Sequence, residues 1–88
     1  MSSPRSLFQT VADKNAPRRT REDAIDGLGE AGATTQLRVI VVSNGLSGRL
    51  RRRALDALGR CRATDELDTL ADDRGLAGSL RKRAEEAR

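Results

Sequence analysis

Apolar residues recur along this chain at the spacing of an amphipathic α-helix. Leu67, Leu70 and Ala71 occupy positions i, i+3 and i+4 of one segment, which places them on one helical face. Thirty residues earlier, Leu37 and Ile40 begin the same spacing. Between these segments lies a longer set that falls on one side of a helical wheel: Leu50, Ala54, Leu55, Ala57, Leu58 and Cys61. The pattern predicts a succession of helices.

The chain repeats itself with a period of thirty residues. Without any gap, residues 21–50 are identical to residues 51–80 at 12 of 30 positions. Leu7 precedes Leu37 and Leu67 in the same register. A repeat of this length is typical of one supersecondary unit stacked on its neighbours. We therefore predict a single domain over residues 1–88, built from three helical hairpins at about 5–30, 34–62 and 64–88.

One segment favours a different structure when it is considered alone. Residues 36–42 are rich in β-branched side chains and lead into Ser43, Asn44 and Gly45, a combination typical of a strand followed by a turn. Its repeat partner, residues 66–72, has the pattern of a helix. Because an ungapped repeat should have one structure in every unit, we predict a helix here as well.

The second helix of each unit carries a signature. In the second unit, Arg51 is followed by Ala54 and then by the pair Leu58-Gly59. Together with the apolar helix that precedes it, this signature resembles HEAT repeats, and most closely the short, thirty-residue variety found in phycobiliprotein lyases. The first unit departs from the pattern with Thr20, and the third ends before a Leu-Gly pair of its own. Both departures are typical of terminal, capping units.

The resemblance implies an all-α fold, namely an α–α superhelix (solenoid) of three HEAT-like helical hairpins with five to six helices. It implies that the first helices form the outer, convex face and that the second helices line the inner, concave one. The binding of protein partners is the commonest role that it implies, although the family also includes nucleic-acid binders and a few enzymes.

The composition removes several kinds of catalytic and metal site. Among the 88 residues there is no His, Trp or Tyr, and there is one Cys and one Phe. Without histidine the chain has no Ser-His-Asp triad, no Cys-His pair and no His-ligated zinc. Cys61 alone forms neither an internal disulfide nor a thiolate cluster, so we expect a cytoplasmic location. We predict a non-enzymatic protein without catalytic residues, metal or cofactor.

No segment indicates a membrane protein. The longest apolar run, residues 39–42, is far too short to cross a bilayer. The first residues of the chain lack the long apolar core of a signal peptide. We therefore expect no association with a membrane.

A repeated arginine lies at the edge of the predicted core. Arg51 falls inside the apolar arc of its helix, and Arg21 and Arg81 hold the same position in the other units. A partly buried guanidinium group needs acceptors. We predict a structural role for these three arginines, which would tie adjacent hairpins together through the repeated carboxylates Asp26 and Asp56 or through carboxylates in the turns.

The other charges of the second helices fall on the exposed arc and change sign along the chain. They sum to −3 in the first unit, +3 in the second and +1 in the third. The candidate partner-binding residues are Arg49, Arg52, Arg53, Arg60, Lys82, Arg83, Glu22, Asp23 and Asp26. A phosphate backbone favours an unbroken positive track, and this arc offers no aromatic side chain to stack bases.

We therefore predict a protein partner that binds the charged face of the second helices. The net charge of +4 keeps nucleic acid, bound to the basic face of units two and three, as the alternative. Two further alternatives stay open. Copies of the chain could associate, with the acidic end of one on the basic middle of another, or the charges could form a solvated face without a specific partner.

Overall fold

The computed structural model describes residues 3–88, which form six α-helices and no strand. The helices are α1 (Pro4–Ala12), α2 (Arg18–Glu30), α3 (Thr34–Val42), α4 (Gly48–Arg60), α5 (Thr64–Ala71) and α6 (Gly78–Ala87). The prediction of an all-helical chain is confirmed. Within residues 3–88, no helix has the length and apolar character that crossing a membrane requires.

The β-branched segment 36–42 lies within α3, so its alternative assignment as a strand is wrong. Leu37, Ile40 and Val41 are completely buried, whereas Val39 is exposed. Positions i, i+3 and i+4 share one face of a helix, so these three side chains enter the core together, while a strand would bury every second residue. Burial of this face outweighs the β propensity of the segment.

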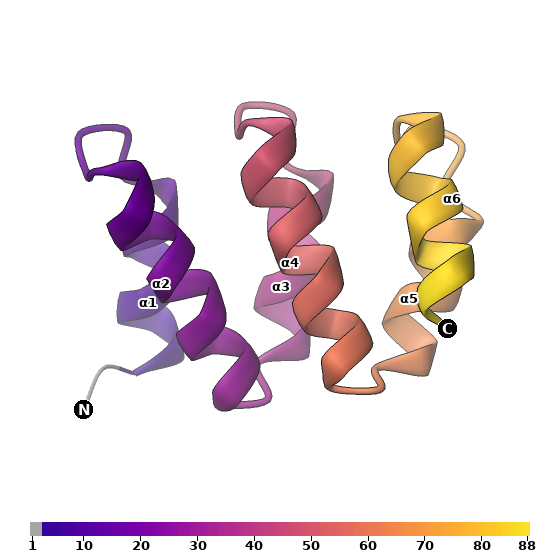
Figure 1. Cartoon of the computed structure of the whole chain (residues 1–88), viewed down its shortest axis with the longest axis horizontal. Helices are drawn as coiled ribbons and strands as arrows, with labels where there is room; N and C mark the ends of the chain where they lie inside the picture. The colour runs from indigo at the N-terminus through magenta and orange to yellow at the C-terminus, as the bar shows by residue number, and fades with distance from the viewer. Residues whose placement is uncertain (1–2) are drawn as a thin grey trace.

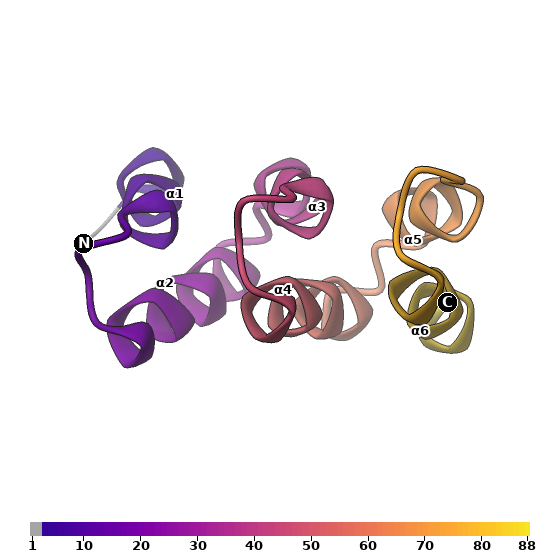
Figure 2. The ribbon, with the colours of Figure 1, turned by 90° about the horizontal axis from the view of Figure 1, so that it is seen from above.

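Consecutive helices pack as pairs: α1 with α2, α3 with α4, and α5 with α6. The pairs lie side by side, so that α1, α3 and α5 form one layer and α2, α4 and α6 form the other (Figure 1; Figure 2). The first two pairs contact each other mainly through α2 with α4, and the second and third pairs through α4 with α6, α4 with α5 and α3 with α5. The outward-facing residues of α2, α4 and α6 therefore make one continuous surface, here called the second-helix face.

The core lies between the two layers and consists of aliphatic side chains. Leu28 and Leu58, at equivalent repeat positions, are completely buried, and no polar or charged residue is buried among residues 3–88. The second helices approach closely because a glycine faces a small residue. A Cβ atom at Gly29 would lie 3.3 Å from the Cβ of Ala57. These small residues set the spacing between pairs.

The two connections between pairs have the same backbone conformation. Gly32 has a φ of 67° and Arg62, its repeat equivalent, has a φ of 54°. After α2, the Ala33 amide donates to the carbonyl of Leu28 at 2.9 Å, and after α4 the Ala63 amide donates to that of Leu58 at 3.1 Å. This is the Schellman motif, which needs a left-handed residue just after the helix and therefore favours glycine. The connection after α4 adopts the same motif although Arg62, and not a glycine, holds the left-handed position.

Candidate functional site

The second-helix face carries ion pairs that cross from one helix pair to the next. Three of them join residues twenty-seven positions apart: Arg49 with Glu22, Arg53 with Asp26, and Arg83 with Asp56. A separation of twenty-seven residues is about one helical turn shorter than the thirty-residue repeat. Each arginine therefore reaches back to the second helix of the preceding pair. Most of the cations and carboxylates that were predicted to bind a partner are therefore paired with one another.

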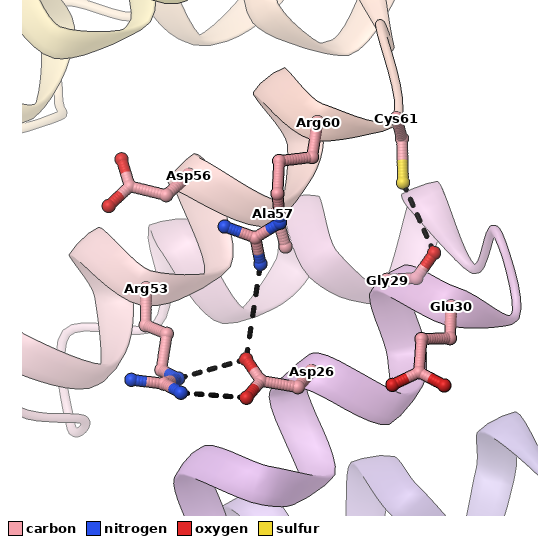
Figure 3. Close-up of a pocket in the computed structure, with 8 residues that line it drawn as sticks. All are labelled: Asp26, Gly29, Glu30, Arg53, Asp56, Ala57, Arg60 and Cys61. Carbon is pink, nitrogen blue, oxygen red and sulfur yellow. Dashed lines mark hydrogen bonds and ion pairs between the residues drawn. The ribbon is translucent and has the colours of Figure 1, made fainter.

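Arg53 and Asp26 form the best-defined pair on this face. The Nε and Nη2 groups of Arg53 donate to the two carboxylate oxygens of Asp26 at 2.9 and 2.7 Å. These hydrogen bonds raise the pKa of the Arg53 guanidinium above its ordinary value. Arg60 also approaches Asp26, at 3.9 Å, so one carboxylate serves two cations of α4 (Figure 3). All three side chains remain partly in contact with solvent, which limits the strength of the pairs.

The next boundary repeats the two-pronged arrangement. The Nε and Nη2 groups of Arg83 donate to the two oxygens of Asp56 at 2.8 and 3.0 Å. The hydrogen bonds to Asp56 likewise raise the pKa of the Arg83 guanidinium. Asp56 was expected to hold one of the repeated core-edge arginines. The structure instead places it against Arg83, which sequence analysis had assigned to a partner.

Arg49 and Glu22 make the third pair, near the start of α4. The Nε group of Arg49 donates to Glu22 at 3.0 Å. The side chain of Glu22 is only 13% exposed, while that of Arg49 is 59% exposed. Glu22 is therefore largely removed from solvent, and it offers little surface to a partner protein.

Three of the candidate partner-binding residues differ from the others. Arg52, Lys82 and Asp23 are exposed and have no ion pair with any of residues 3–88. Arg52 and Lys82 occupy the same repeat position on α4 and α6. These three side chains are the candidate residues whose charges remain unneutralised on the second-helix face.

A hollow of about 590 Å³ lies between the C-terminal halves of α2 and α4. Its charged lining consists of Asp26, Glu30, Arg53, Asp56 and Arg60 (Figure 3). On the far side, the Sγ of Cys61 donates to the carbonyl of Gly29 at 3.3 Å. The thiol thus contacts the backbone of the preceding pair. A hollow lined by charges of both signs suits polar side chains of a partner better than an apolar ligand.

The repeated core-edge arginines bind backbone carbonyls. The Nε of Arg21 donates to the carbonyl of Val11 at 2.8 Å, and that of Arg51 donates to the carbonyl of Val41 at 2.7 Å. Both carbonyls belong to the last turn of the preceding first helix, where acceptors lack intrahelical partners. The structure therefore differs from the expected carboxylate acceptors: these arginines tie together the two helices of one pair instead of two adjacent pairs.

The third unit lacks this hydrogen bond. The Nε of Arg81 is buried and has no hydrogen-bond partner among residues 3–88. The equivalent first helix, α5, ends at Ala71, which makes it one residue shorter than α1 and α3. Arg81 therefore shares the position of Arg21 and Arg51 but not their contact.

Sequence analysis missed the ion pairs between successive second helices, although the sequence contains a signal for them. Arginine and aspartate recur at the distance that places them on facing helices: Asp26 with Arg53, and Asp56 with Arg83. Searching for opposite charges about one turn short of the repeat length would have found both. The search needs the assumption that equivalent helices stack in register, which the repeat by itself supports.

Neither metal chemistry nor a known relative adds to this site. Residues 3–88 contain no group of three or more Cys, Asp or Glu side chains placed to hold a metal ion. No protein-family model, curated protein or solved structure matches the chain significantly.

Proposed function

We propose that this chain is a short solenoid of HEAT-like repeats that binds a protein partner through the second-helix face, without a catalytic role. The side-by-side packing of three helix pairs and the shared repeat signature support the solenoid. The ion pairs on the second-helix face favour a protein over a nucleic acid as the partner, because they neutralise most of the cations there. Of the six cations among the candidate partner-binding residues, four pair with carboxylates: Arg49, Arg53, Arg60 and Arg83.

This pairing argues against a phosphate backbone as the ligand. A nucleic acid gains affinity from each phosphate that a cation neutralises, because condensed counterions are released. A cation already bound to a carboxylate must break that pair first. A mosaic of fixed positive and negative groups instead complements the mixed charges of a protein surface and gives specificity. The lone cysteine supports the cytoplasm as the place of this binding.

Nucleic acid remains the second candidate because of Arg52 and Lys82. Both are exposed and unpaired within residues 3–88, and they occupy equivalent positions on adjacent second helices. Two such cations, together with the net charge of +4, could contact successive phosphates. Binding of this kind would weaken with rising salt, with a slope of about one unit per contacted phosphate.

The experiment is capture of partners from lysate on the immobilised chain, with and without nuclease. We expect a defined protein to be captured after nuclease treatment. The double variant Arg52→Glu/Lys82→Glu and the single variant Asp23→Lys should each reduce this capture at least tenfold. Asp23 is chosen over Asp26 because reversal of Asp26 would also break its pair with Arg53.

Arg74→Glu is the matched control. Arg74 is exposed and lies in the turn between α5 and α6, outside the second-helix face. It should leave capture unchanged, although it reverses one positive charge, as each substitution of the double variant does. Loss of every partner on nuclease digestion, with salt-sensitive binding of RNA or DNA that Asp23→Lys strengthens, would establish nucleic acid instead. If no variant of the second-helix face changed capture, this face would be a solvated surface without a specific partner.

A further inference from the structure

An apolar groove runs along the opposite layer, between α1 and α3. It consists of two adjoining hollows of about 570 and 300 Å³. Phe8 lines both hollows, Val39 lines the first, and Ile40 and Leu46 line the second. The first hollow lies between the N-terminal halves of α1 and α3, and the second lies between their C-terminal halves and the turns that follow. The groove therefore follows the two helices along their length. This layer is the one opposite the second-helix face (Figure 2).

The groove exists because α1 and α3 barely touch. Adjacent α3 and α5 pack against each other, but α1 packs almost entirely against α2. Thr10 stands where the second and third units have the buried residues Ile40 and Leu70. Thr10 therefore adds less apolar surface to the packing of α1 than Ile40 and Leu70 add to that of α3 and α5.

The two residues that make the groove apolar depart from the repeat. Phe8 is the only aromatic residue of the chain, and the other units have Arg38 and Asp68 at its position. Val39 is 36% exposed, and its repeat equivalents are Gln9 and Thr69. The repeat architecture thus accommodates polar residues at both positions. Phe8 is partly buried and packs against the core, so it also contributes to folding, whereas Val39 is exposed. Together they give this groove an apolar surface that the other units lack at these positions.

The two charged residues that line the groove, Arg5 and Lys14, are of one sign, although Glu66 accepts a hydrogen bond from Thr34 at the start of α3. Neither α1 nor α3 contains an Asp or Glu. Arg5 lines one end of the groove and Lys14 the other, and neither forms an ion pair with any of residues 3–88. Asp13, the nearest carboxylate in the sequence, accepts a hydrogen bond from the Asn15 amide at 2.9 Å.

We infer that this groove binds a short, acidic amphipathic helix of a partner protein. Apolar side chains of that helix would cover Phe8 and Val39, and carboxylates at its two ends would pair with Arg5 and Lys14. The nine residues of α1 span roughly 13 Å, at about 1.5 Å per residue. The groove therefore suits an apolar stripe of two to three turns, a mode in which side chains at i, i+3 or i+4 and i+7 are anchors.

A second copy of this chain does not meet these requirements. Val39 is the only large apolar side chain of residues 3–88 that is exposed. The acidic helix α5 buries its own Leu67 and Leu70, so it has no apolar stripe to insert. The occupant is therefore another protein. This inference does not depend on the function proposed for the second-helix face, since the two surfaces lie on opposite layers.

The test selects ligands from a display library of amphipathic helices that vary in their apolar stripe and flanking charges. We expect enriched peptides to carry Asp or Glu on both sides of an apolar stripe. Binding of the best peptide, measured by isothermal titration calorimetry, should weaken at least tenfold in Phe8→Arg/Val39→Gln. Both substitutions introduce residue types found at equivalent positions of other units. Thr69→Gln, at the position equivalent to Val39 on α5, should leave binding unchanged.

Two further measurements complete the test. Arg5→Glu/Lys14→Glu should weaken the acidic peptide at least tenfold and favour a version with lysines in place of its acidic residues. If the double groove variant does not fold by circular dichroism, Val39→Gln alone should weaken binding severalfold, because Val39 is exposed. Failure to enrich acidic peptides, or binding that Val39→Gln leaves intact, would overturn the proposal. So would Phe8- and Val39-dependent binding to phosphatidylserine vesicles without any peptide ligand.

Discussion

Arg53 and Asp26 face each other across the boundary between α4 and α2, with two hydrogen bonds of 2.9 and 2.7 Å between guanidinium and carboxylate. Arg83 and Asp56 repeat this contact between α6 and α4 at 2.8 and 3.0 Å. Equivalent residues thus make the same contact at both boundaries between helix pairs. The charged surface of this protein is therefore partly an internal connection between its helix pairs.

The first prediction concerns the strength of this connection. A double-mutant cycle of Arg53→Ala and Asp26→Ala should give a coupling free energy of about 0.5–1 kcal/mol, because a two-pronged pair in contact with solvent is only modestly stabilising. Urea unfolding at low and high salt measures it, and high salt should reduce it. The cycle of Arg52→Ala with Asp26→Ala is the control and should give no coupling. Equal coupling in the two cycles would contradict the pairing.

The second prediction compares two adjacent arginines of α4, Arg51 and Arg52, with Arg81, the repeat equivalent of Arg51 on α6. Arg51→Ala should lower the free energy of unfolding by about 1–3 kcal/mol, since it removes a charged hydrogen bond and leaves the carbonyl of Val41 without its donor. The exposed Arg52→Ala should change it by no more than about 0.5 kcal/mol. Arg81→Ala should cost less than Arg51→Ala, because the Nε of Arg81 has no partner within residues 3–88. Thermal or urea unfolding gives this order, and equal losses at residues 51 and 81 would refute it.

The third prediction concerns the connections between pairs. Arg62→Gly should stabilise the protein by about 0.5–1 kcal/mol, because an L-residue with a side chain pays about 1–2 kcal/mol in the left-handed region and glycine does not. At the equivalent position, Gly32→Ala should destabilise it by about 1 kcal/mol. No atom lies within 4 Å of a Cβ placed at Gly32, so the loss would come from the backbone alone. Melting temperatures that move in the same direction for both variants would contradict this explanation.

The fourth prediction tests the close approach of the second helices. Gly29→Val should destabilise the protein by about 1–3 kcal/mol, because its side chain would push α2 and α4 apart. Gly59→Val should cost less, since the facing Ala87 is the last residue of α6 and has more freedom to move. Gly45→Val, where a Cβ has no neighbour within 4 Å, is the control and should be nearly neutral. A loss at Gly45 as large as that at Gly29 would exclude a packing cause.

The helical character of the chain follows from its local features. The spacing of Leu67, Leu70 and Ala71 predicts α5, and the ungapped repeat transfers that assignment to the β-branched α3. The helical wheel also distinguishes Arg51, at the edge of the core, from the exposed Arg52. These predictions succeed because helical periodicity and the burial of one face depend mainly on residues within one turn of each other.

The partners of the charged side chains do not follow in the same way. Arg51 was expected to bind a carboxylate, but its Nε donates to the carbonyl of Val41 and its Nη2 to the Oδ1 of Asn44. The stronger acceptor, a backbone carbonyl, is a group that every residue carries and that no sequence pattern marks. Phe8 was recorded as the one aromatic residue, yet nothing in its own segment indicated that it would line a groove with Val39, from the neighbouring unit. Such contacts depend on where separate helices lie.

By itself, the sequence determined that this protein is helical, that it has a thirty-residue repeat and which side chains enter the core. Only the tertiary structure decided that Arg53 binds Asp26, that Arg52 and Lys82 remain unpaired among residues 3–88, and that α1 and α3 leave a groove. The physical reason lies in distance: an ion pair or a groove depends on differences of a few ångströms between helices. Those distances are set by packing at positions such as Gly29 and Ala57. A methyl group added at Gly29 would place its carbon only 3.3 Å from the Cβ of Ala57.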